Sequence, residues 1–160
     1  MSSRNAILLC VFALAAAGCG KSEKTIATPG GAVTVTKSGN TTSVQVSGKD
    51  GKVTIASNEK GVALPDKFPA DVPVMPGATV KMAVVVGENF SLHLGTAASQ
   101  ADVARYYDEN LKAKGWTVDP AASVGELTIV SAKKGERKLG INIVKEGTGS
   151  VLQLMVPRDG

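Results

Sequence analysis

Residues 80–116 read VKMAVVVGENFSLHLGTAASQADVARYYDENLKAKGW, and within this stretch the spacing of apolar side chains changes from strand-like to helix-like. Residues 80–86 are largely apolar, and Phe90, Leu92 and Leu94 then alternate with polar neighbours, which is the two-residue period of a strand. After Ser99 the apolar side chains recur every three or four residues, as on one face of a helix. The stretch therefore predicts two strands followed by one helix.

The predicted helix has recognisable ends. Ser99 is expected to cap its first turn, and Asp102 places a negative charge near the positive end of the helix dipole. Gly115 is expected to end the helix in the left-handed conformation that glycine adopts readily, with Trp116 folding back onto the last turn. The apolar side chains that share one face of this helix are Val103, Tyr106, Tyr107 and Leu111.

Strand-like segments follow the helix. They are expected over residues 116–118, 126–132, 139–144 and 150–156, with glycine-containing turns between them. Valine, which favours strands because it branches at Cβ, occurs 19 times after position 18. We therefore predict that residues 78–157 form an α+β domain, with an antiparallel β-sheet and one packed α-helix.

A short N-terminal β-meander is predicted to precede this domain, over residues 31–57. Three alternating segments are separated there by turns rich in Gly, Asn and Asp. A short meander has little core of its own, so we expect it either to dock on the main sheet or to act as a spacer. Its apolar row comprises Val33, Val35, Val44, Val46, Val53 and Ile55.

Residues 58–77 form a proline-rich connection, with four of the seven prolines in the segment 64–77, LPDKFPADVPVMPG. Proline fixes its own φ and favours an extended predecessor, so this segment is predicted to be an extended arm. A helix about 10 Å wide cannot cover five strands spanning about 24 Å, so we expect the arm, and the meander, to cover the rest. The competing interpretations are cover by a partner protein or a second copy and, for the arm, a proline-rich ligand of an adaptor domain.

The N-terminus has the pattern of an export signal. Arg4 precedes the segment 6–17, which has no charged side chain, and the small residues Ala16-Ala17-Gly18 lead to Cys19. This pattern resembles the lipobox of bacterial lipoproteins, although Ala16 stands where the family usually has Leu. The resemblance implies a signal peptide over residues 1–18 and a lipid on the Cys19 thiol. An ordinary secreted protein is the alternative.

The resemblance also implies a location in the cell envelope. We expect residues 19–30 to be the lipidated Cys and a polar tether between the membrane and the fold. Gly20, rather than Asp, follows Cys19, and in the diderm lipoprotein family this implies an outer membrane location facing the periplasm. Cys10 would leave with the signal, so no disulfide is expected in the folded part.

A second resemblance covers residues 64–157. The run PVMPGA at 73–78, the pair Tyr106-Tyr107, Leu111 and the pair Gly115-Trp116, followed by a β-rich tail, are similar to a domain common in poorly characterised bacterial lipoproteins. The resemblance implies a fold and carries no catalytic residues. Tyr106, Tyr107 and Trp116 are expected in the core, with a ligand pocket or an interface as the alternative.

The chemistry of the chain argues against catalysis and against metal or nucleic-acid binding. His93 is the only histidine, and no nucleophile or orienting acid is arranged around it by the sequence. With Cys19 acylated, no set of Cys and His ligands is left for zinc, and no other cofactor is expected. The net charge is only +4, and one basic cluster occurs, at Lys133, Lys134, Arg137 and Lys138, which predicts no nucleic-acid binding.

These patterns favour a non-catalytic function. We predict a membrane-anchored lipoprotein that acts as a binding, adaptor or envelope-maintenance module, held by the lipid on Cys19 and contacting an unknown envelope protein. The alternative is a carrier of a small apolar ligand that binds between the helix and the sheet.

The anchor can be tested at one residue. Cys19→Ser removes the thiol that would carry the lipid, so we expect it to abolish labelling by a fatty-acid probe and to leave an uncleaved precursor. Metabolic labelling and intact mass measure both effects. Unchanged labelling together with an unchanged mature mass would exclude lipidation at this site.

Overall fold

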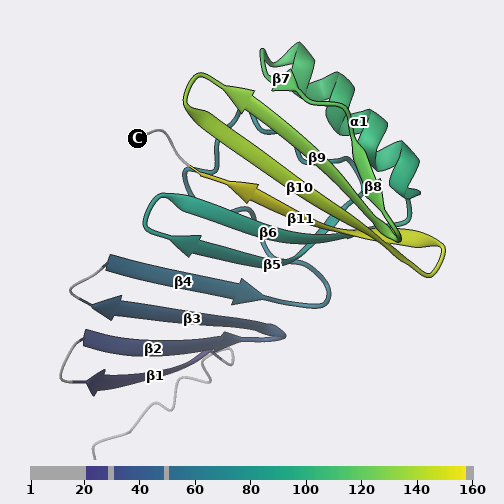
Figure 1. Ribbon diagram of the computed structural model, residues 1–160. Helices are drawn as coiled ribbons and strands as arrows, with labels where there is room; N and C mark the ends of the chain where they lie inside the picture. The colour runs from purple at the N-terminus through teal and green to yellow at the C-terminus, as the bar shows by residue number, and fades with distance from the viewer. Residues whose placement is uncertain (1–20, 29–30, 49–50, 158–160) are drawn as a thin grey trace, which may run out of the picture.

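The computed structural model describes residues 21–28, 31–48 and 51–157 of the chain. In these residues it shows one antiparallel sheet of eleven strands and a single helix, α1 (Gln100–Ala113) (Figure 1). The strands are β1 (Lys21–Thr28), β2 (Gly31–Ser38), β3 (Thr41–Gly48), β4 (Gly51–Ser57), β5 (Thr79–Val86), β6 (Asn89–Thr96), β7 (Thr117–Val118), β8 (Ala122–Val124), β9 (Leu127–Lys134), β10 (Arg137–Glu146) and β11 (Gly149–Val156).

The strand order is β1-β2-β3-β4-β5-β6-β11-β10-β9-β7, and β8 pairs with β9. The first six strands follow the chain order, and α1 then carries the chain from β6 to the far side of the sheet. The three strands β9, β10 and β11 return as a meander, so that β11 lies beside β6. There Leu92 pairs with Leu154 and Leu94 pairs with Leu152, all four fully buried. The C-terminal strand therefore forms the centre of the core.

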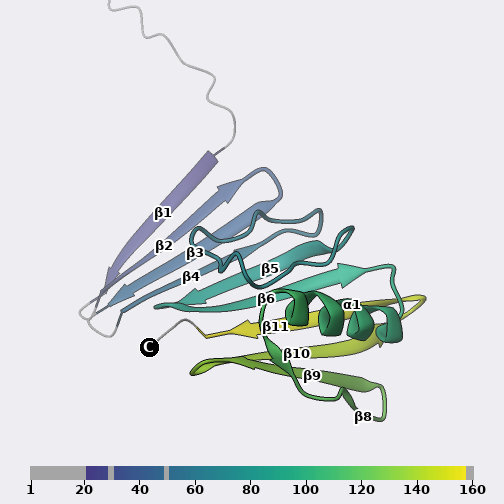
Figure 2. The same cartoon turned by 90° about the horizontal axis from the view of Figure 1, so that it is seen from above.

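The core lies on one face of β5, β6 and β9–β11. Helix α1 packs over β9, β10 and β11 on this face (Figure 2). The arm, residues 58–77, packs on the β5–β6 side of the same core. The buried apolar residues of the core are Val72, Val80, Ala83, Phe90, Leu92, Leu94, Val103, Tyr107, Leu111, Trp116, Val130, Ala132, Leu139, Ile141, Ile143, Leu152, Leu154 and Val156.

The ends of α1 are as the sequence predicted. The Ser99 hydroxyl accepts a hydrogen bond from the Asp102 backbone N–H at 3.2 Å and donates one to the Asp102 carboxylate. Gly115 has a φ of +80°, and the Trp116 N–H donates to the Leu111 carbonyl at 3.0 Å, which returns the chain toward the sheet. The cap thereby places Trp116, which is 3% exposed, in the core.

The predicted packing of the arm on the main sheet is confirmed. The Phe68 ring meets the Phe90 ring edge-on, with 5.6 Å between centroids. The Tyr106 hydroxyl donates to the Val74 carbonyl at 3.1 Å, and the Trp116 indole N–H donates to the Asp71 carbonyl at 3.0 Å. Apolar contacts and two backbone hydrogen bonds, from the Asn58 N–H to the Lys81 carbonyl and from the Val62 N–H to the Val80 carbonyl, hold the arm on the sheet. The hydrogen bonds from Tyr106 and Trp116 tie the arm to the helix and its C-terminal cap.

Asp71 also binds two cations from the β9–β10 hairpin. Its carboxylate accepts hydrogen bonds from Lys134 Nζ at 2.9 Å and from Arg137 Nη1 at 2.8 Å. The Arg137 guanidinium lies over the Trp116 ring, 4.8 Å from its centroid. Burial alone would raise the pKa of Asp71, but the hydrogen bonds and charges of Lys134 and Arg137 outweigh burial and lower it. Asp71 is therefore a charged link between the arm, the helix cap and the hairpin.

The predicted α+β class is wrong. The described part of the chain is a mostly β structure in which one helix accompanies eleven strands. The predicted meander does not precede a separate sheet, because β4 pairs with β5 along five residues and the two parts form a single sheet. Residues 21–28, predicted to belong to the tether, form the additional strand β1, which pairs with β2 over its whole length.

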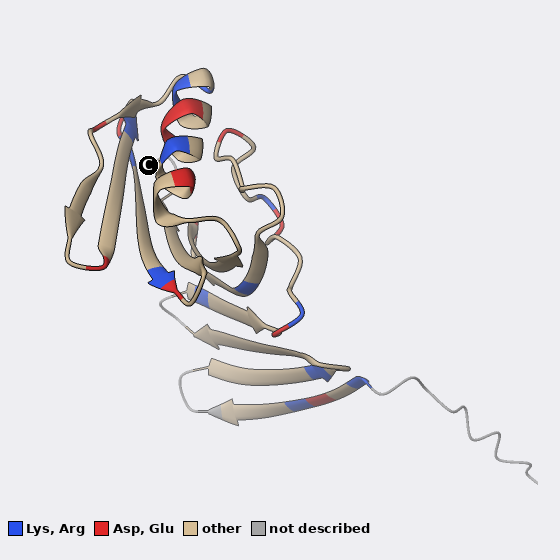
Figure 3. Cartoon of the chain, turned by 90° about the vertical axis from the view of Figure 1, so that its right-hand side faces the viewer, with Lys and Arg blue, Asp and Glu red and all other residues tan. Residues whose placement is uncertain are grey.

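The meander also does not cover the main sheet as predicted. It extends the sheet sideways, because β4 forms hydrogen bonds along the edge of β5. The meander also carries few charged residues compared with the helix and the turns (Figure 3). The predicted site of lipidation, Cys19, and the signal peptide lie outside the described residues.

The Asp71 link gives a pH-dependent prediction. Asp71→Asn removes the charge that two cations share, and we expect it to lower the free energy of unfolding at pH 7 by about 1–2 kcal/mol. Because the folded-state pKa lies below the ordinary value of 3.8, this contribution is complete above that value and is lost as the pH falls through the folded-state pKa. Urea unfolding at pH 7 and near pH 3 measures the difference, which should shrink in acid.

Asp66→Asn is the matched control, because Asp66 is an exposed residue of the same arm. We expect this variant to stay within about 0.5 kcal/mol of the wild type. Equal effects of the two substitutions would contradict a special role for Asp71.

Candidate functional site

The sheet has a covered face, which carries α1 and the arm, and an open face on its other side. Directly paired residues of antiparallel strands lie on the same face, and successive residues alternate between faces. Ala83 is 3% exposed and belongs to the core, so its neighbour Val84 lies on the open face. Val84 pairs with Ile55, and Val86 pairs with Val53. The apolar side chains of the meander therefore lie on the open face, away from the core.

Two apolar rows run along this face, one across β1–β5 and the other across β2–β5. The valine rows, as we call them, follow the registers of four successive strand pairs. Ile26 and Val86, at the two ends of one row, are 51% and 48% exposed, and Val46 between them is 40% exposed. One row comprises Ile26, Val33, Val46, Val53 and Val86, and the other comprises Val35, Val44, Ile55 and Val84.

The polarity of the two faces is reversed between the meander and the main sheet. On the covered face, the meander strands carry polar side chains such as Gln45 and Thr54, whereas β6 carries Leu92 and Leu94. On the open face, the valine rows of β1–β5 give way to Ser91 and His93 in β6. A contiguous exposed apolar area of this kind marks an interaction surface in most soluble proteins. The valine rows are therefore the first part of the candidate site.

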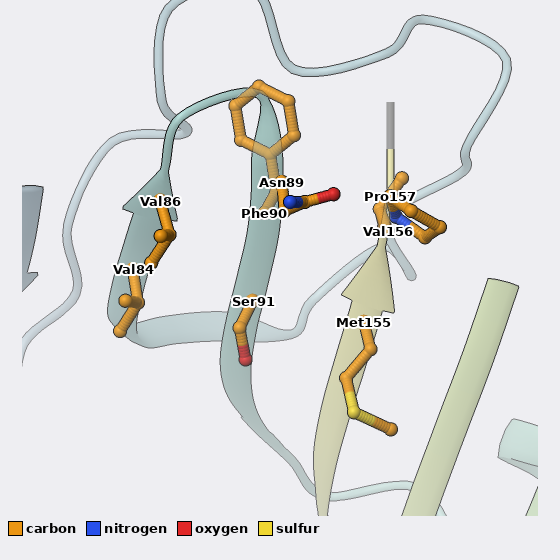
Figure 4. Close-up of a pocket in the computed structure, with 8 residues that line it drawn as sticks. All are labelled: Val84, Val86, Asn89, Phe90, Ser91, Met155, Val156 and Pro157. Carbon is orange, nitrogen blue, oxygen red and sulfur yellow. The ribbon is translucent and has the colours of Figure 1, made fainter. Parts of the chain in front are cut away.

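A hollow of about 290 Å³ lies at the end of the valine rows (Figure 4). Val84 pairs with Ser91, and Ser91 pairs with Met155, so a small residue stands between two apolar ones. A Cβ at Gly140 would lie 3.3 Å from Met155 Cε, which shows that the Met155 side chain lies over Gly140, away from Ser91. The residues that line the hollow are Val84, Val86, Asn89, Phe90, Ser91, Met155, Val156 and Pro157.

The polar side chains at the hollow come from Ser91 and Asn89. The Ser91 hydroxyl lies 3.5 Å from the Gln153 amide nitrogen, a long contact that leaves the oxygen able to accept a stronger hydrogen bond. A mostly apolar lining with a small number of polar groups is typical of a site for an apolar molecule with one polar end. Sequence reasoning missed this hollow, because it depends on the pairing of β6 with β11.

The space between helix and sheet is filled by side chains. Val103, Tyr107 and Leu111 from α1 are fully buried against the sheet. Burial raises the pKa of Tyr107, and the Met75 backbone beside the hydroxyl lowers it by less, so the phenol is neutral in the physiological range. Tyr107 and Trp116 are core residues, and Tyr106 is partly buried at the edge of the core, as the core interpretation predicted.

His93 lies on the open face, beside Met82 on β5 and Gln153 on β11. Among the residues that the structure describes, it makes no hydrogen bond or ion pair with a carboxylate or a hydroxyl. In the same residues, no three His, Cys, Asp or Glu side chains converge as metal ligands would. The structure thus does not join His93 to the partners that a catalytic histidine uses.

The predicted basic cluster is divided between the two faces. Lys134 and Arg137 bind Asp71 on the covered face. Lys133 pairs with Lys138 across β9 and β10, and alternation places both on the open face. The four residues therefore do not form one continuous basic surface.

Comparison with known proteins gives one finding. Residues 78–150 match a family model described as START domain-like, which covers less than half of the 160 residues and leaves out the meander and the arm. Neither the curated proteins nor the solved structures include a match. In the described part of the chain, no helix has the length and apolar character needed to cross a membrane.

His93→Ala tests whether this side chain has more than a surface role. Because no described contact depends on the imidazole, we expect the free energy of unfolding to change by a few tenths of a kcal/mol. Chemical denaturation measures this change. A loss of cellular function with normal stability and abundance would instead show that His93 takes part in the function of the protein.

Proposed function

We propose that this chain is a non-catalytic binding module, anchored to the bacterial envelope by a lipid on Cys19, that binds apolar molecules on the open face of its sheet. The observation that carries the proposal is the exposed apolar surface formed by the valine rows and the adjoining hollow. Its support for binding is physical, because water is released when such a surface is covered.

Two features support binding in preference to catalysis. The match of residues 78–150 to a START domain-like family model favours a ligand-binding module. The candidate site itself contains aliphatic side chains, a hydroxyl and an amide, none of which is paired with a general base. Such a site binds and orients a molecule without a group that would transform it.

The lipid anchor is supported by the pattern Ala16-Ala17-Gly18-Cys19 and by the position of the first strand. β1 begins at Lys21, which places the sheet immediately after the proposed lipidation site. An envelope lipoprotein of this kind would present its open face to molecules close to a membrane.

An apolar ligand is better accommodated by the hollow than by the space between helix and sheet. The helix and the sheet are in direct contact through fully buried side chains, whereas the hollow is open to solvent and has a volume of about 290 Å³. This volume lies near the lower limit of small-molecule sites. It suits one ring or part of an acyl chain, whose polar end the Ser91 hydroxyl or the Asn89 amide would bind.

Filling the hollow tests the proposal. Ser91→Leu places a branched side chain between Val84 and Met155, so we expect binding of a fluorescent fatty acid to weaken at least fivefold. Fluorescence titration measures binding, and thermal unfolding checks that the fold is retained.

Ser43→Leu is the matched control, because Ser43 lies on the covered face of the meander, away from the hollow. We expect this variant to bind as the wild type does. If Ser91→Leu also retains full affinity, the ligand does not occupy the hollow.

A further inference from the structure

We infer that the valine rows of β1–β5 lie against the surface of the bilayer that carries the anchor, so that the meander is a membrane-contacting surface. The inference rests on the proposed function, since it requires the lipid on Cys19. It goes further by naming the occupant of the valine rows and by separating them from the hollow, which remains for a smaller ligand.

The first observation behind this inference is the short length of chain between the anchor and the sheet. Cys19 and Lys21 are separated by two peptide units, which span at most about 7 Å. Lys21 is the first residue of β1, and β1 is the edge strand of the sheet. A lipid on Cys19 would therefore hold this edge directly at the headgroups. The residues predicted to be a tether do not provide one, because they are paired with β2.

The second observation is that lysines lie beside the valine rows on the open face. Lys24 pairs with Val35, and Lys37 pairs with Ser22 and Thr42, so both lysines lie on the open face close to the anchored edge. Glu23 alternates to the other face. Lysine amines on this side complement anionic phospholipid headgroups, while their aliphatic stems extend the apolar surface.

The extent of the apolar rows fits a limited contact. Five strands span roughly 20 Å between the outermost two, at about 4.8 Å per step. The right-handed twist turns each strand by about 20–25° from its neighbour, so a flat surface can follow only part of the width of this sheet. The valine rows end at β5, and Ser91 and His93 take their place on β6. The apolar surface is therefore limited in width, as a contact with a flat bilayer would be.

An environment-sensitive fluorophore on either face of β3 tests the inference. Val46 is on the open face and its neighbour Gln45 is on the covered face. The full chain with Val46→Cys or Gln45→Cys is purified from membranes, labelled with a nitrobenzoxadiazole dye, and reconstituted in vesicles of phosphatidylglycerol and phosphatidylethanolamine. Cys19 is blocked by its lipid in this material.

We expect quenching by headgroup-level nitroxide lipids to be at least threefold stronger at position 46 than at position 45. Lys24→Gln combined with Lys37→Gln should reduce the difference on these anionic vesicles, and less on phosphatidylcholine vesicles. Lys52→Gln, on the covered face of β4, is the charge-matched control and should leave the difference unchanged.

The outcomes distinguish the two proposals. Protein that does not float with vesicles overturns the anchor, and the docking inference with it. Protein that floats, but whose position 46 stays as exposed to water as position 45, overturns the docking inference alone. The dye at position 46 could instead report exclusion of water in detergent, before vesicles are added, and more strongly as the protein concentration rises. This result would mean that a second copy of the chain covers the valine rows, and it would also overturn docking on the bilayer.

Discussion

The pairing of β4 with β5 determines the surface chemistry of the whole molecule. Five residues of each strand are joined, from Val53 opposite Val86 to Ser57 opposite Met82. Since side chains alternate with a period of two, a slip of one residue would move every valine of the meander to the covered face. There the rows would compete with the arm for the space beside β5. The observed register instead places them outside, in line with the hollow at Ser91.

The covered face shows how one helix suffices for a sheet of this width. Helix α1 packs over β9–β11, and the arm supplies the apolar cover for β5 and β6 through Phe68 and Val72. The arm contains turns, in which the Phe68 N–H donates to the Pro65 carbonyl and the Val72 N–H donates to the Pro69 carbonyl. Its other carbonyl groups need partners from elsewhere. The Tyr106 hydroxyl and the Trp116 indole N–H provide them at Val74 and Asp71. Tyr106 within the helix and Trp116 just after it are therefore structural links as well as parts of the core.

Local sequence signals predicted much of this half of the protein. The caps at Ser99 and Gly115 and the apolar packing of the arm depend on neighbouring residues or on composition, and these features are readable in a single sequence. The sequence could not predict which face of the sheet carries the apolar side chains of the meander. Residues 58–78 separate β4 from β5 and carry no information about the register between them. The hollow was missed for a similar reason, since Ser91 and Met155 are brought together only when β11 inserts beside β6. Strand β1 was missed because its polar composition resembles a tether.

The reversal of polarity along the sheet has a consequence for stability. The main sheet buries its apolar side chains under α1 and the arm, but the four strands of the meander expose theirs and present polar side chains on the other side. These strands are joined to the main sheet through the pairing of β4 with β5, and their apolar face gains little stability from burial while it has no cover. Opening of the meander should therefore require less free energy than unfolding of the core, as is usual for elements with few buried contacts. A molecule that covers the valine rows would then stabilise the meander, which is the least stable part of the fold. Binding to the valine rows and ordering of the meander are therefore thermodynamically linked.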